Sequence, residues 1–84
     1  MERHDLVQRL LAIFAEEFEI ENPGLDDDLR EEHEFDSIDA ITLLQEIEVM
    51  LETTLSQKEK KGAMEIRTIN QICDYVETIL ATRT

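Results

Sequence analysis

Apolar residues recur at intervals of three and four in the first quarter of the chain. Between Leu6 and Phe18 this spacing places an aliphatic and aromatic stripe on one side of a helix. A residue that precedes proline disfavours helical geometry, so this helix is expected to end near residues 20–22, before Pro23 and Gly24. The pattern therefore predicts an amphipathic helix there.

A second helix is predicted to begin at Asp36 or Ser37 and to run to about Glu52. Asp36 suits the N-cap, and Asp39 places a carboxylate in the first turn, where the positive end of a helix favours it.

Successive side chains of a helix point about 100° apart around its axis. When the direction of Ser37 is set to zero, the side chains of this second helix fall into two arcs. The arc between roughly 220° and 340° is predicted to face the core, and it holds Ala40, Leu43, Leu44, Ile47, Met50 and Leu51. The arc between about 20° and 140° mixes acidic and polar residues with aliphatic ones, and it holds Ile38, Ile41, Thr42, Gln45, Glu48, Val49 and Glu52. Scattered exposed aliphatics are ordinary, but aliphatics aligned with acids beside a helix terminus indicate a docking surface.

The rest of the chain holds one short and one longer helix. Ser56 and Glu59 have the spacing of a capping box for a short helix that Gly62 would close. Thr68 and Gln71 repeat the capping pattern before a final helix, whose apolar stripe is Ile69, Ile72, Val76, Ile79 and Leu80.

Residues 22–36 show no sustained period and are predicted to form a long loop, of a length that is usually functional or disordered. Leu25, Leu29 and Phe35 are expected to pin it to the bundle. With two Gly and one Pro in 84 residues there is little material for hairpin turns. The fold class predicted is therefore all-α, a four-helix bundle of three longer helices and one short helix, forming one domain over 1–84.

Charge narrows the choice of partners. The chain has 21 acidic and 8 basic residues, a formal charge of −13. Between Glu16 and Glu52 stand fifteen acids and one base, Arg30. This imbalance excludes nucleic acid, argues against anionic membranes, and favours a basic protein partner. The alternative is that the acids merely keep a small protein soluble.

Other chemistries find little support. Asp26, Asp27 and Asp28 lack the alternating ligands, glycine and glutamate of an EF-hand loop, so no metal site is predicted. His4 and His33 stand in polar contexts and are expected to be exposed, which leaves a serine nucleophile without a base.

The lone Cys73 is expected to be a buried, inert thiol and fits a reducing compartment. No signal peptide and no membrane span are visible, so a cytoplasmic protein is expected.

The segment from Phe35 to Ile41 (Phe-Asp-Ser-Ile-Asp-Ala-Ile) resembles the Asp-Ser-Leu-Asp signature of acyl carrier proteins. The segment 68–76 also looks like that family's last helix, and the resemblance covers nearly the whole chain in order and spacing. It implies a non-catalytic carrier whose Ser37 holds a covalent 4′-phosphopantetheine through a phosphodiester. The thiol of that arm would carry acyl intermediates of fatty-acid, lipid or polyketide biosynthesis as thioesters, partly sheltered between the helices.

The resemblance also implies partners and contact residues. The partners would be a phosphopantetheinyl transferase and acyl-loading and acyl-processing enzymes with basic patches, meeting a monomeric carrier. The partner-binding residues would be Asp36, Ile38, Asp39, Ile41 and Glu48, with the acids meeting basic patches and the isoleucines making aliphatic contacts.

The chain departs from the family pattern at four positions near the signature. Glu34 stands where a glycine is common, His33 replaces a leucine, Thr42 a glutamate and Gln45 a methionine. We interpret these departures as signs of a specialised carrier with few partners.

Three alternatives remain at this point. The chain could be an aminoacyl or peptidyl carrier of the same fold, or a helical adaptor without a prosthetic group. Ser37 could also be a plain helix-capping serine, although Asp36 already suits that task.

Overall fold

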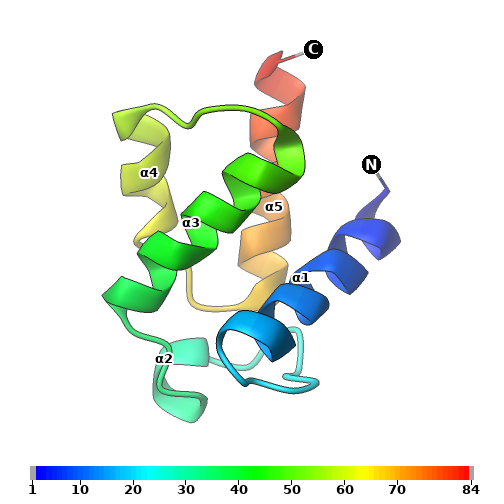
Figure 1. The fold of residues 1–84 in the computed structure, drawn as a ribbon, viewed down its shortest axis with the longest axis vertical. Helices are drawn as coiled ribbons and strands as arrows, with labels where there is room; N and C mark the ends of the chain where they lie inside the picture. The colour runs from blue at the N-terminus through cyan, green and yellow to red at the C-terminus, as the bar shows by residue number, and fades with distance from the viewer. Residues whose placement is uncertain (1, 84) are drawn as a thin grey trace.

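The computed structural model describes residues 2–83, and the regular secondary structure of these residues is entirely helical. The helices are α1 (Arg3–Glu17), α2 (Leu29–Glu32), α3 (Ser37–Leu51), α4 (Gln57–Ala63) and α5 (Ile69–Arg83). Figure 1 shows α3 crossing obliquely over α5, with α1 on one side of this pair and α4 on the other. The predicted all-α bundle is confirmed, with one further short helix, α2, inside the expected loop.

The core lies where the apolar stripes of α1, α3 and α5 meet. Its buried side chains come from these helices and from the connecting segments: Leu6, Leu10, Phe14, Ile20, Leu29, Phe35, Ala40, Leu43, Leu44, Ile47, Leu55, Ala63, Ile69, Ile72, Cys73, Val76 and Ile79. The predicted core arc of α3 is confirmed, although Met50 and Leu51 pack against the core half-buried. Cys73 is buried as predicted, and burial raises the pKa of its thiol.

Two predicted helix ends need correction. The first helix ends at Glu17, before residues 20–22, because Glu19 adopts a left-handed φ of 56° that turns the chain away. The short helix is not closed by Gly62. It continues through this residue to Ala63, and Met64 is its C-cap.

The predicted capping boxes form. In α4, Ser56 and Glu59 exchange hydrogen bonds of 2.8 and 3.1 Å between side chain and backbone. Before α5, the Gln71 N–H donates to the Thr68 hydroxyl at 3.1 Å, and the Gln71 amide oxygen accepts from the Thr68 N–H at 3.2 Å.

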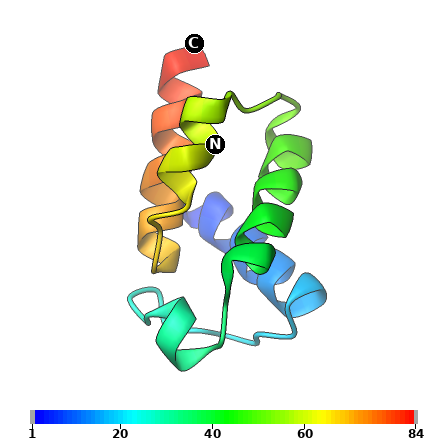
Figure 2. The same cartoon turned by 90° about the vertical axis from the view of Figure 1, so that its left-hand side faces the viewer.

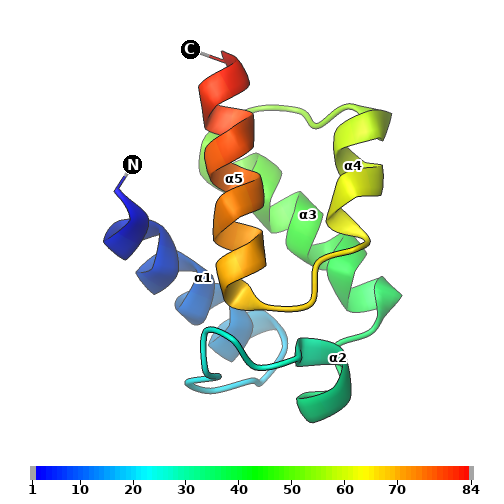
Figure 3. The same cartoon turned by 180° about the vertical axis from the view of Figure 1, so that it is seen from behind.

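The segment between α1 and α3 is held in place by the connection between α4 and α5. The Leu29 N–H donates to the Arg67 carbonyl at 2.7 Å, and the Asn70 N–H donates to the Leu25 carbonyl at 3.0 Å. Figures 2 and 3 show the result: α2 lies below the bundle, at the end where α3 begins and beside the α4–α5 connection. Leu29 and Phe35 are buried as predicted, whereas Leu25 is 37% exposed, lies outside the core cluster and holds the segment through its backbone carbonyl.

Candidate functional site

Ser37 is the first residue of α3, and its side chain is exposed. Asp36 is the N-cap of this helix. Its carboxylate accepts from the Asp39 N–H at 3.0 Å, while the Asp39 carboxylate accepts from the Asp36 N–H at 3.2 Å. This reciprocal pair caps the helix without Ser37. The interpretation of Ser37 as a plain capping serine is therefore wrong.

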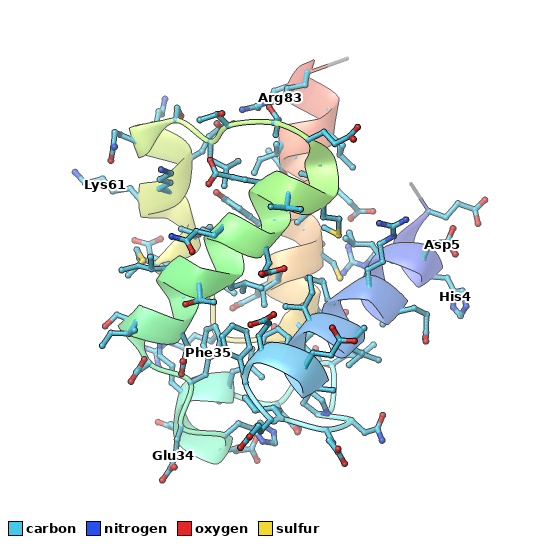
Figure 4. The ribbon with its side chains drawn as sticks, viewed as in Figure 1. His4, Asp5, Glu34, Phe35, Lys61 and Arg83 are labelled. Carbon is cyan, nitrogen blue, oxygen red and sulfur yellow. The ribbon has the colours of Figure 1, made fainter. Side chains whose placement is uncertain are left out.

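The residues just before Ser37 hold it at the surface. Phe35 is 3% exposed and packs its ring against Phe14 and Phe18, with centroids 5.3 and 5.2 Å apart. Glu34, one residue earlier, has a left-handed φ of 56°. In Figure 4 Glu34 points away from the bundle and Phe35 points into it. This reversal anchors the chain two residues before the serine, so that α3 begins with Ser37 outside the core.

The start of α3 is suited to a phosphate. The Ser37 hydroxyl and the N–H groups of Ser37 and Ile38 make no hydrogen bond to another residue of 2–83. Unpaired N–H groups and the positive end of the helix dipole both favour an anion at this place. An exposed hydroxyl beside two unpaired donors fits a phosphodiester-linked group.

The other predicted contact residues surround Ser37 or follow it along α3. Ile38 is 73% exposed and Ile41 is 52% exposed. Asp36 is exposed, whereas Asp39 is half-buried by the capping contact.

Glu48, two turns beyond Ile41, has a structural contact that the sequence did not reveal. Its carboxylate accepts from the Leu55 N–H at 2.8 Å and so secures the connection between α3 and α4. Ile41 and Glu48 therefore project to the Ser37 side of α3, whereas Ile38 lies about 100° from Ser37 and Asp39 about 160° from it. The five predicted residues are not gathered on one side of the helix. Asp36, Asp39 and Glu48 each accept a local hydrogen bond.

A cleft of about 320 Å³ lies between α3 and α4. Its lining is contributed by both helices: Ile41, Leu44, Gln45, Glu48, Gln57, Lys60, Lys61 and Met64. Ile41, Leu44 and Glu48 project within about 40° of the direction of Ser37, so the cleft continues the strip of α3 that starts at the serine. Sequence reasoning missed the α4 side of this cleft, because a seven-residue helix carries too little periodicity to show which side faces α3.

Two other predictions can be compared with the structure. His4 is exposed as predicted, but His33 is half-buried, with its Nε2 atom 3.2 Å from the Asp27 carboxylate. The Gly24 N–H and the His33 ring hold the pKa of the Asp27 carboxyl below its usual range. His33 was missed because Asp27 becomes its neighbour only through the fold of the segment around α2.

The three consecutive aspartates of this segment also make separate local contacts. Asp26 accepts from the Asn70 amide at 2.7 Å, and Asp28 is the N-cap of α2. Among residues 2–83 no group of three or more His, Cys, Asp or Glu side chains is placed to hold a metal ion.

These features describe a small helical bundle that exposes a serine hydroxyl at the first position of its α3 helix. The model of the phosphopantetheine attachment site family matches residues 8–76, and the chain belongs to this family. The resemblance to acyl carrier proteins is thereby confirmed at the level of the carrier domain. Searches of the curated proteins and of the solved structures gave no match.

Membership has two consequences for this protein. Its cofactor is a covalently attached 4′-phosphopantetheine, whose terminal thiol supplies the group that holds a cargo as a thioester. A carrier domain also implies contact with a phosphopantetheinyl transferase and with partner enzymes.

None of the helices in the described part of the chain combines the length and apolarity needed to cross a membrane.

Proposed function

We propose that Ser37 is the attachment residue and that the protein is an acyl carrier, which presents thioester-bound acyl intermediates to enzymes of fatty-acid, lipid or polyketide biosynthesis. The observation that carries this proposal is the Ser37 hydroxyl, which is exposed at the capped start of α3 and makes no hydrogen bond to another of the residues 2–83. Ser37 also lies inside residues 8–76, which match the family model. Ser56, the other serine of the chain, is the N-cap of α4, and its hydroxyl already accepts from the Glu59 N–H.

In this proposal the protein positions the cargo and does no chemistry on it. The N-terminus of α3 stabilises the phosphodiester, and the cleft between α3 and α4 shelters the acyl chain, because Ile41, Leu44 and Met64 offer it apolar contact. Visiting enzymes supply the catalytic groups.

Docking is proposed for the exposed side of α3, from Asp36 to Glu48. Ile38 and Ile41 would make apolar contacts at the centre, and the acids would draw a basic patch toward Ser37. On the same side Thr42 stands where other carriers often have a glutamate, which lowers the negative charge, and Gln45 stands where they often have a methionine, which makes the side more polar. Both changes support a specialised carrier with few partners.

Co-expression with a broad-specificity phosphopantetheinyl transferase tests the attachment. Intact mass is expected to rise by one phosphopantetheine group in the wild type and to stay unchanged in Ser37→Ala. Ser56→Asn is the matched control, since asparagine keeps an N-cap oxygen, and it should be modified like the wild type. A modified Ser37→Ala protein would refute the assignment.

An unmodified wild type would instead favour a helical adaptor without a prosthetic group. The mass of the group bound to protein isolated from its native host identifies the cargo, and an amino acid or peptide on the arm would favour the aminoacyl or peptidyl carrier. A turnover assay with housekeeping fatty-acid enzymes tests the specialised role, which equal turnover with those enzymes would exclude.

A further inference from the structure

The lining of the cleft has an unusual charge for this molecule. Lys60 and Lys61 outnumber Glu48 among its charged residues, so the cleft is net positive in a chain whose formal charge is −13. The Glu48 carboxylate is already engaged by the Leu55 N–H, whereas neither lysine side chain has a hydrogen bond or ion pair within residues 2–83.

The unpaired state of these lysines contrasts with the arginines that hold the fold together. Arg3 pairs with Asp74 at 2.8 Å, Arg83 pairs with Glu59 at 2.8 Å, and the Arg30 guanidinium donates to the Met64 carbonyl at 2.9 Å. Each of these bases links two elements of the bundle. Lys60 and Lys61 make no such link, so their charges are available to a ligand.

The cleft that the lysines line runs along α3 on the same side as the serine. Seven residues separate Ile41 from Glu48, so the cleft extends about 10 Å along α3 away from the Ser37 end. Lys60 is half-buried at the cleft, and Lys61 is exposed at its rim, where Figure 4 shows its side chain extending away from the bundle. An acyl group on the end of an arm attached at Ser37 that folds back along α3 would contact the apolar side chains of Ile41 and Leu44 beside these amines.

We infer that the cleft takes acyl groups with an anionic end, such as an ω-carboxylate, and that Lys60 and Lys61 pair with this charge. The inference rests on the proposed attachment at Ser37. The apolar lining contacts the methylene chain, Gln45 and Gln57 offer amide donors near the opening, and the lysine pair offsets the negative field of the whole protein. A plain alkyl chain would use only the apolar residues of the lining, whereas a chain with an anionic end would use the lysines as well.

The test compares two arms loaded on the apo protein by a transferase: an octanoyl group and its ω-carboxylated counterpart of equal chain length, both as non-hydrolysable amides. Backbone amide chemical shifts report contact with Ile41, Leu44 and Met64, and a ¹³C label on the terminal carboxylate reports its pKa. The variant is Lys60→Gln with Lys61→Gln. Lys58→Gln is the matched control, because Lys58 lies on the same helix but lines a different hollow, between α4 and α5.

In the wild type, the carboxylated arm is expected to change the backbone amide chemical shifts of the residues that line the cleft. Its carboxylate should bind protons about two- to five-fold more weakly in the wild type than in the double variant, the effect of a partly screened ion pair. Lys58→Gln should match the wild type, and the octanoyl arm should respond to none of the changes.

Three results would overturn the inference. The first is that the two arms change the amide chemical shifts of the cleft equally. The second is that the pKa of the arm's carboxylate is the same in the double variant as in the wild type. The third is that Lys58→Gln changes this pKa as much as the double variant does, which would mean that the net charge of the protein, and not the lysine pair, sets it. Absence of any arm on Ser37 would overturn the proposed function together with this inference, whereas normal loading without discrimination would overturn the inference alone.

Discussion

At the scale of single residues, the presentation of Ser37 depends on the backbone turn just before it. Phe35 is buried in the core and Asp36 caps α3. The backbone changes direction at Glu34, whose φ is 56°. A left-handed conformation costs an L-residue with a Cβ about 1–2 kcal/mol, and glycine avoids this cost. The glutamate therefore stores strain three residues before Ser37, the proposed attachment residue, at a position where acyl carrier proteins commonly have glycine.

Replacing Glu34 with glycine should stabilise the protein. The relief of strain exceeds the extra entropy that glycine loses on folding, so we expect the free energy of unfolding to rise by about 0.5–1 kcal/mol. Chemical denaturation at equilibrium measures it. Glu31→Gly is the control: it removes the same charge from a helical position in α2, and should destabilise. A Glu34→Gly protein no more stable than the wild type would show that this turn is unstrained.

At the scale of elements, Glu48 lies on the proposed docking side of α3 and also helps to place α4. Its carboxylate secures the Leu55 N–H, and Leu55 is buried at the entry to the α4 cap. Reversing its charge with lysine would disturb both roles at once. Glutamine separates them, because its amide oxygen still accepts from the Leu55 N–H while the charge is lost.

Glu48→Gln should leave the melting temperature near that of the wild type and slow loading of Ser37 by a basic transferase. We expect about a two- to five-fold decrease in kcat/KM at low salt that fades at high salt, since exposed charges are screened. Steady-state kinetics at two ionic strengths measure it.

The matched control is Glu46→Gln, which changes the same charge on α3 at about 180° from Ser37 and should load normally. Equal salt dependence in all three proteins would exclude Glu48 from docking.

At the scale of the whole molecule, arginines join parts of the bundle that lie far apart in the chain. Arg83, at the end of α5, pairs with Glu59 of α4 and donates to the Thr54 carbonyl at 3.0 Å in the α3–α4 connection. Figure 4 shows Arg83 at the top of the molecule, beside this connection. Beneath it, the Tyr75 hydroxyl donates to the Glu59 carbonyl at 2.6 Å. These contacts fix α4 against α5 and so set the position of the cleft wall.

The Arg83–Glu59 pair predicts a specific acid sensitivity. Arg83, followed by the Ser56 N–H, lowers the pKa of the Glu59 carboxyl from 4.5 to about 2. Because the pKa in the folded state is the lower one, the stabilisation is complete above pH 4.5 and is lost as the pH falls toward 2.

Glu59→Gln keeps the capping box and removes the charge. The stability difference between wild type and variant, measured by urea denaturation, should therefore be constant above pH 5 and shrink toward pH 2. Glu65→Gln, at an exposed position without a side-chain partner in the described residues, should show no such trend. A constant difference down to pH 2 for Glu59→Gln would contradict the lowered pKa.

Local features of the fold were predictable from the sequence. The long helices, the capping boxes at Ser56 and Thr68, the cap at Asp36 and the position of Ser37 all depend on residues within one or two helical turns of each other. The end of α1 was misplaced because Glu19 turns the chain with its left-handed φ before Pro23 is reached, and the end of α4 because Gly62 keeps a helical conformation without a positive φ.

Ser37 and the acidic, partly aliphatic side of α3 were thus determined by the sequence itself, since helical period and capping are short-range. The tertiary structure decided the rest: the order of the segment around α2, the pairing of His33, the left-handed Glu34, and the position of Lys60 and Lys61 of α4 at the cleft beside α3. Each of these depends on contacts between residues far apart in the chain, or on a short segment whose own pattern is compatible with several orientations until packing selects one.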